Sequence, residues 1–274
     1  MQPQSRRERR DSRGEGRRRL RSSSPLLCVF LCALCVSAVA FSAVGCAKTS
    51  RPSPLPTYPG LDNAAALKVL ADRAQAVKTL SGRADLTLTR PDGQTVQLDG
   101  AVAMAPPEKL RLRAWKFGQA VFDLTLTDEG LWVMAPQDPG RREKVLPASL
   151  SAAQFGREWA MLNGSYFLEP DLSARTEGRW LLVGRRLEDG RAVVCRVDRA
   201  TLTPRRYEMR DPQGRLRFRF GLGGYRVFEG IPMATRLAAR SPDGKIDIRL
   251  REVGLNEELA PTAFRPPRRA EKHE

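Results

Sequence analysis

Residues 215–220 read Arg-Leu-Arg-Phe-Arg-Phe, and residues 110–113 read Leu-Arg-Leu-Arg. Successive side chains of a β-strand point to opposite faces of the sheet, so each stretch puts its apolar residues on one face and its arginines on the other. Such strands build a sheet with an apolar face that needs a cover and a cationic face that can meet water. The alternation therefore predicts a mainly β protein with antiparallel strands.

Turn signals divide the rest of the chain into hairpins. Pro91-Asp92-Gly93, Asp128-Glu129-Gly130 and Pro242-Asp243-Gly244 each separate two runs of period two. The expected strands cover 82–90, 94–104, 110–115, 120–127, 131–135, 142–146, 179–186, 191–198, 205–210, 215–228 with a glycine-softened bend, 233–239 and 245–253. This pattern predicts an antiparallel meander of about eleven or twelve strands, which curls because strands twist.

Two segments have helical spacing instead, which makes the expected class α+β. Asp62 can cap a first helix, and residues 150–162 form a second one that would lie on one face of the sheet. Apolar residues recur every three or four positions in the first helix, at Ala66, Leu67, Leu70, Ala74, Val77 and Leu80. Two helices are few for so wide an apolar face, and this shortage suggests an apolar cavity.

The alternation also selects side chains that would line such a cavity. Phe155 and Trp159 lie four positions apart on the second helix and so share a face that could form the lid. The expected wall consists of Leu112, Phe122, Leu124, Leu126, Trp132, Phe218 and Phe220. The alternative is an ordinary packed core, which such residues form more often than not.

The N-terminus carries export and lipidation signals. An arginine-rich arm precedes an uncharged apolar run from Leu26 to Gly45, and Ala43-Val44-Gly45-Cys46 reads as a lipobox. We expect residues 1–45 to be a lipoprotein signal peptide and Cys46 to carry a diacylglyceryl anchor, whose two chains hold stably to a membrane. The alternative is a retained transmembrane anchor, since a run of this length could just cross a bilayer.

The mature chain divides into three parts. Residues 46–60 form a lipidated, proline-rich tether, a composition that favours an extended spacer. Residues 61–266 form one domain, and residues 267–274 are expected to be a disordered tail. Cys195 is then the one thiol beside the lipidated Cys46, and its place in an apolar strand favours a buried hydrophobe over a reactive thiol.

Charge and composition limit the partners and the chemistry. The 274-residue chain has a net charge of +16, and His273 is its one histidine, so no Ser/His/Asp, Cys/His or histidine-rich zinc set can be assembled. We expect no enzyme activity, no cofactor and no metal. Nucleic acid is an unsuitable partner for two reasons: the protein is expected to be exported, and its aromatic residues lie on the other face of the sheet from its arginines. Anionic lipid headgroups fit better, and the simpler alternative is solubility with no partner at all.

Several segments resemble the periplasmic lipoprotein-sorting superfamily, which includes the LolA-like carrier and LolB-like receptor of the Lol pathway. The resemblance covers about residues 61–266. It is carried by Leu80-Ser-Gly-Arg-Ala84 after the first helix, by the strand-turn-strand segment 198–214, and by the closing segments 230–236 and 253–264. It implies a half-open antiparallel barrel with a helical lid that holds acyl chains of lipoproteins or phospholipids in an apolar cleft, with a periplasmic carrier protein as a further partner.

The resemblance also points to one loop and one location. A lipid-anchored member resembles the outer-membrane receptor, in which an apolar residue beside a glycine follows the third strand. Trp115, Phe117 and Gly118 fall in that place, so Phe117 is the candidate for insertion into a bilayer or a cargo chain. The alternative is that Phe117 folds back over the barrel rim. In the Lol pathway, an Asp directly after the lipidated cysteine favours retention in the inner membrane. Ala47 stands at that position here, which supports a location at the periplasmic face of the outer membrane.

Two hypotheses follow for the function. The first is a lipid-handling module that receives or carries acyl chains in lipoprotein localisation. The second is a structural or interaction lipoprotein that uses a packed barrel as a scaffold, and a lipid-sensing regulator is a further alternative. The first two differ in whether the cleft is empty or packed.

Overall fold

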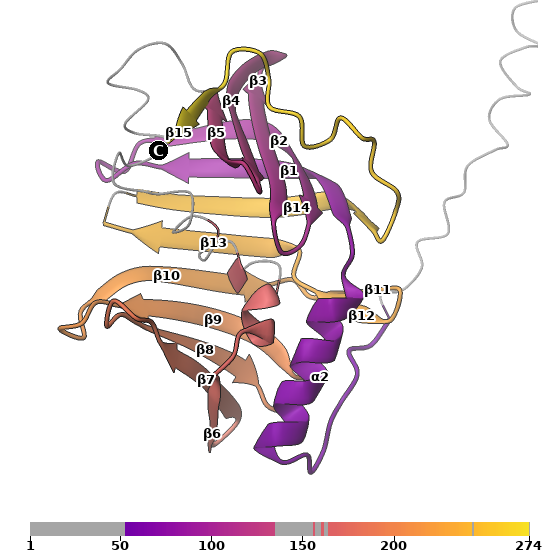
Figure 1. Ribbon diagram of the computed structural model, residues 1–274, viewed down its shortest axis with the longest axis vertical. Helices are drawn as coiled ribbons and strands as arrows, with labels where there is room; N and C mark the ends of the chain where they lie inside the picture. The colour runs from indigo at the N-terminus through magenta and orange to yellow at the C-terminus, as the bar shows by residue number, and fades with distance from the viewer. Residues whose placement is uncertain (1–52, 135–155, 157–159, 162–163, 243, 274) are drawn as a thin grey trace, which may run out of the picture. The chain divides into compact units, whose positions relative to one another are not determined.

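The computed structural model describes residues 53–134, 156, 160–161, 164–242 and 244–273, which belong to one compact unit, Pro52–Glu274. A single 13-stranded antiparallel sheet dominates it, in the order β15-β5-β4-β3-β2-β1-β14-β13-β10-β9-β8-β7-β6, and β11 and β12 form a separate hairpin. Figure 1 shows β14 and β13 in the middle of this sheet, between β1–β5 and β6–β10. The edge strands β15 and β6 do not pair with each other, so the sheet is open, as expected for a half-open barrel.

The strands follow the turn signals of the sequence. Their bounds are β1 (Leu80–Thr89), β2 (Thr95–Ala105), β3 (Lys109–Lys116), β4 (Gln119–Thr127), β5 (Gly130–Met134), β6 (Ser173–Glu177), β7 (Trp180–Arg186), β8 (Ala192–Asp198), β9 (Thr203–Arg210), β10 (Leu216–Gly223), β11 (Arg226–Phe228), β12 (Ile231–Met233), β13 (Arg236–Ser241), β14 (Gly244–Leu255) and β15 (Glu271–His273).

The mainly β, α+β fold class is confirmed, and the strands differ from the expectation at residues 215–228 and at β6. The expected long strand 215–228 is divided, because Gly224 has a positive φ of 61° and turns the chain between β10 and β11. β6 is an additional strand. Its sequence, Ser-Ala-Arg-Thr-Glu, lacks the apolar alternation that predicts a strand, and four of its five residues are exposed. The expected strand 142–146 lies outside the described residues.

Alternation along the strands produces two apolar clusters. Cluster 1 gathers buried residues of β1–β5 and β14, among them Leu86, Leu110 and Leu124. Cluster 2 gathers buried residues of β7–β10 together with Ala66 and Leu70 of the helix and Phe167 of the 3-10 turn η1 (Ser165–Leu168). The core of the protein therefore lies on the apolar face that the sequence predicts.

The first expected helix is α2, Asn63–Ala76, and it covers cluster 2. Asp62 caps it, since its Oδ1 accepts a hydrogen bond from the Ala65 amide at 2.7 Å. Ala66, Leu70 and Ala74 form its buried side, and the helix packs against η1 and β6. In the part of the chain that the structure describes, no helix is long and apolar enough to span a bilayer.

The end of the proline-rich tether contacts the domain. The Tyr58 amide donates to the Ala200 carbonyl at 2.8 Å, and the Arg73 guanidinium lies 4.9 Å from the centre of the Tyr58 ring. Tyr58 and Leu61 also pack against cluster 2. These contacts fix where the chain enters the domain, close to the expected boundary at residue 60.

The C-terminal residues are ordered into a strand, where the sequence predicted a disordered tail. Glu271–His273 forms β15 and pairs with β5, with Lys272 opposite Trp132. The Lys272 ammonium lies 5.9 Å from the centre of the Trp132 ring. The edge of β5 presents backbone N–H and C=O groups with which an extended segment can form hydrogen bonds. This pairing depends on the tertiary structure, so the composition of the tail does not predict it.

A nearly buried ion pair lies on the polar face of β3 and β4. Asp123, whose side chain is 4% exposed, accepts from Arg111 Nη2 at 2.8 Å and Nε at 3.0 Å. Thr125 donates to the same carboxylate, and Arg111 Nη1 donates to the Ala263 carbonyl at 3.2 Å. Arg111 therefore ties the C-terminal segment to the sheet instead of facing water.

We predict that Asp123→Ala lowers the free energy of unfolding by about 3 kcal/mol, because removal of one partner leaves a largely buried guanidinium without its counter-charge. Urea unfolding followed by circular dichroism measures this. Asp72→Ala is the matched control, since the Lys68–Asp72 pair is exposed and should change stability by less than about 0.5 kcal/mol. Equal losses for the two variants would contradict the structural role of Asp123.

Candidate functional site

The structure brings together most of the residues predicted to line a cleft. Leu112, Phe122, Leu124 and Leu126 are all buried in cluster 1. Phe220 is buried in cluster 2, and the Phe218 ring stacks on it at 6.3 Å between centroids. These six residues share the apolar face of the sheet but belong to two separate clusters.

Trp132 does not share that face, so its assignment to the cleft wall was wrong. On β5, Leu131 and Val133 are the buried residues of cluster 1, and Trp132 lies between them on the other face, opposite Thr125 of β4. The short run Gly-Leu-Trp-Val-Met is apolar throughout, so period two alone did not decide which of its residues point inward. Trp132 is instead partly covered by β15.

Three residues of the expected lid are described, and Phe155 and Trp159 lie outside the described residues. Gly156, Ala160 and Met161 are helical. A Cβ built on Gly156 would lie 3.8 Å from Leu126 Cδ2 of cluster 1, and Met161 is buried in cluster 2. The described residues of the expected lid therefore lie against both clusters.

Phe117 forms the exposed tip of the β3–β4 hairpin, and it does not fold back over the sheet. It is 91% exposed, and the Lys116 ammonium lies 5.5 Å from the centre of its ring. Phe117 and Gly118 both have positive φ, at 52° and 77°, as a tight two-residue hairpin turn requires. A bulky residue is unfavourable in this conformation, and strain of this kind tends to occur at functional sites.

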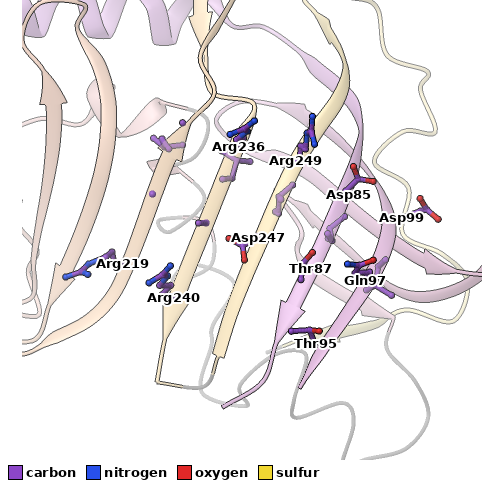
Figure 2. A pocket seen from close by; sticks show the side chains of 18 of the residues that line it. Asp85, Thr87, Thr95, Gln97, Asp99, Arg219, Arg236, Arg240, Asp247 and Arg249 are labelled. Carbon is purple, nitrogen blue, oxygen red and sulfur yellow. The ribbon is translucent and has the colours of Figure 1, made fainter. Parts of the chain in front are cut away.

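A large pocket lies on the polar face of the sheet, and the sequence analysis did not identify it. Its volume is about 1170 Å³. β1, β2, β10, β13 and β14 supply most of its wall, and Trp115, Lys116 and Phe117 contribute to its rim. Figure 2 shows Arg219 and Arg240 on one side of it and Asp85 and Asp99 on the other. The alternation of arginine with apolar residues predicted a cationic face but not a hollow in it.

Cys195 lies away from this pocket, in cluster 2. It is fully buried, and burial raises the pKa of its thiol well above the usual range. A thiol that stays protonated is a poor nucleophile, so the residue acts as a small apolar side chain.

Comparison with solved structures identifies the fold. A LolA superfamily protein from Nitrosomonas europaea aligns with a TM-score of 0.51 and 12% identity, over 74% of this chain and 98% of that one. An outer-membrane lipoprotein-sorting protein domain from Vibrio parahaemolyticus aligns at 0.53 and 10%, over 74% and 96%. The chain has the LolA-superfamily fold.

A third structure, a DUF1329 family protein from Desulfovibrio piger, aligns with a TM-score of 0.55 and 14% identity, over 73% of this chain and 96% of that one. No protein-family model and no curated protein sequence matches the chain. The predicted resemblance is thus confirmed for the fold.

We predict that Phe117→Asn stabilises the isolated protein by about 0.5–1 kcal/mol, because Asn tolerates the left-handed conformation that Phe adopts there at a cost. Urea unfolding in the absence of lipid measures the change. Leu216→Asn, at another exposed apolar position, should not stabilise the protein, because it lies in a strand. Destabilisation by Phe117→Asn would show that the phenyl ring supports the fold.

Proposed function

We propose that this protein is a lipid-anchored lipoprotein at the periplasmic face of the outer membrane and that it binds acyl chains in a cleft on the apolar face of its sheet. Its role would be in lipoprotein localisation or lipid handling, without enzymatic chemistry. The LolA-superfamily fold supports a lipoprotein-handling role, and the lipobox ending at Cys46 supports the anchor.

One observation carries the proposal: the helical residue Gly156 lies over cluster 1. A Cβ built on Gly156 would lie 3.8 Å from Leu126 Cδ2, whereas α2 packs on the cluster 2 side, against η1 and β6. A helix that lies on a sheet shares side-chain contacts with it but no backbone hydrogen bonds. An acyl chain can therefore enter between the two layers without breaking the sheet, and Leu112, Phe122 and Leu124 would then contact it.

The energetics favour such binding without polar contacts. Each methylene transferred from water into an apolar cleft contributes about 0.8 kcal/mol. A cleft along β3 and β4 that takes about ten methylenes would therefore hold a chain firmly. Phe117, exposed at the end of the same two strands, supports a transfer step at a membrane surface.

A cavity-filling variant tests the proposal. Leu112→Trp puts a larger side chain into cluster 1, so it should weaken binding of a fluorescent fatty acid about tenfold or more while the melting temperature stays within a few degrees, because an unfilled cleft accepts the extra volume. Titration of the full chain in neutral vesicles measures the affinity, and thermal unfolding by circular dichroism measures the stability.

Leu181→Trp is the matched control, since Leu181 is fully buried in cluster 2 beneath α2. Overpacking there should cost about 1–3 kcal/mol of stability without changing the affinity of the folded protein for the probe. If Leu112→Trp is destabilised as strongly as Leu181→Trp and the wild type binds no fatty acid, cluster 1 is a packed core. The interaction-scaffold function would then take the place of lipid handling.

A further inference from the structure

Four arginines surround a floor of small residues in the polar-face pocket. We call Arg206, Arg219, Arg236 and Arg240 the arginine frame; all four line the pocket. The floor consists of Ala238 on β13 and, directly opposite it, Gly221 on β10.

The register places the frame around this floor. Ala238 lies between Arg236 and Arg240 along β13, since residues two apart share a face. Arg219 lies two residues from Gly221 on β10, and Arg206 of β9 lies opposite Gly221. Asp247 of β14 closes the remaining side, opposite Ala238. The floor therefore has cations on three sides, and Asp247 lies on the fourth, toward the part of the pocket that β1 and β2 line.

The positive charge of the frame is only partly compensated. Arg206, Arg219 and Arg210 share one carboxylate, that of Glu208, at 3.6, 3.5 and 3.1 Å. The Asp247 carboxylate forms an ion pair with the Lys245 ammonium, at 2.5 Å. Within the described residues, Arg236 and Arg240 have no ion-pair partner, and the Arg219 Nε atom is buried without a hydrogen-bond acceptor.

Like charges also face one another across the strands. Arg219 lies opposite Arg240, and Arg236 lies opposite Arg249. Directly opposed like charges destabilise a sheet. An anion held over Ala238 and Gly221 would relieve this repulsion, which gives the frame a reason to bind one.

Gly221 leaves the floor of the pocket free of a side chain, although the fold does not require glycine at this position. Gly221 lacks a positive φ, and a Cβ built on it would make only ordinary contacts, at 3.8 Å from the Ala238 carbonyl oxygen. Gly223 has open space around the corresponding position. Glycine inside a strand weakens it and often marks a close approach of a ligand. Here it leaves room for a group that the arginines can reach.

The rim of the pocket indicates where that anion comes from. Lys116 and the exposed Phe117 line the same pocket as the frame. An apolar side chain and clustered cations on one surface are the combination that binds the interface of an anionic membrane, with the apolar group among acyl chains and the cations at phosphates. Arginine suits phosphate because its planar fork donates two hydrogen bonds at once.

We propose that the arginine frame is a binding site for the phosphate of an anionic phospholipid headgroup at the membrane surface, engaged while Phe117, on the rim of the same pocket, inserts. This site is on the opposite face of the sheet from the acyl-chain cleft. The proposal rests on the membrane location given under the proposed function but not on the cleft, so a packed cluster 1 would leave it intact.

Arginine footprinting on the full chain tests this site. The protein, held by its own anchor, is reconstituted in vesicles of phosphatidylcholine alone or mixed with phosphatidylglycerol in equal parts, and reacted with phenylglyoxal, an uncharged reagent. Modification of each arginine is read by mass spectrometry. With phosphatidylglycerol, modification of Arg236 and Arg240 should fall about fivefold, the factor expected for one cation held near an anionic surface.

Internal and variant controls make the result specific. Arg175 on β6, whose side chain is 74% exposed, should react equally in both vesicles. Gly221→Leu, which fills the floor, should abolish protection of Arg236 and Arg240 while circular dichroism shows an intact sheet, and Arg175→Gln should leave protection unchanged. If Gly221→Leu fails to fold, Arg240→Gln provides the same comparison, with protection of Arg236 as its readout.

Three outcomes would overturn the proposal. Equal modification in both vesicles would mean that the frame binds no headgroup. A fall of equal size at Arg175 would mean a general surface effect. Inorganic phosphate could also be added to the protein in phosphatidylcholine vesicles. If it protects Arg236 and Arg240 from modification as strongly as phosphatidylglycerol does, the site binds a free anion. Fatty-acid binding is measured separately, so failure here is distinguishable from failure of the cleft.

Discussion

The pairing of β1 with β14 is the interaction on which the rest of the structure depends. It runs from Leu80 opposite Leu255 to Thr89 opposite Lys245, with one bulge, and it joins the first half of the sheet to the second. Gly82 is needed beside this bulge, because a Cβ there would lie 2.4 Å from the Glu252 carbonyl oxygen. A slip of one residue would move every apolar side chain of β14 to the polar face, so this register fixes the chemistry of both faces.

The two faces then provide two different environments on one scaffold. On one face lie cluster 1, which Gly156 approaches at Leu126, and cluster 2, which α2 covers and to which Met161 belongs. On the other, the same register brings Arg236 opposite Arg249 and Arg249 opposite Asp85, which builds the charged pocket. Phe117 and Lys116 lie where the β3–β4 hairpin reaches the rim of that pocket, so one hairpin links a candidate membrane contact to the sheet.

The sequence predicted what depends on local period and turn chemistry. It located β1–β5, β7–β9 and β14, the Asp62 cap and the apolar face, because alternation and Asp-Gly turns act over a few residues. It failed where long-range pairing decides: β15 pairs with the edge of β5, and Trp132 turns outward within a run that is apolar on both faces. The pocket was missed for the same reason, since Gly221 and Ala238 become neighbours only through the β10–β13 register.

The most direct test of the central claim is to find which face of the sheet an acyl chain contacts. A photoactivatable fatty acid, bound to the full chain in neutral vesicles and cross-linked, would be mapped by mass spectrometry of the peptides. We predict adducts on β3 and β4 at cluster 1 residues such as Leu112 and Leu124. Saturable binding with adducts confined to the polar face, or no specific adduct in a folded protein, would contradict it.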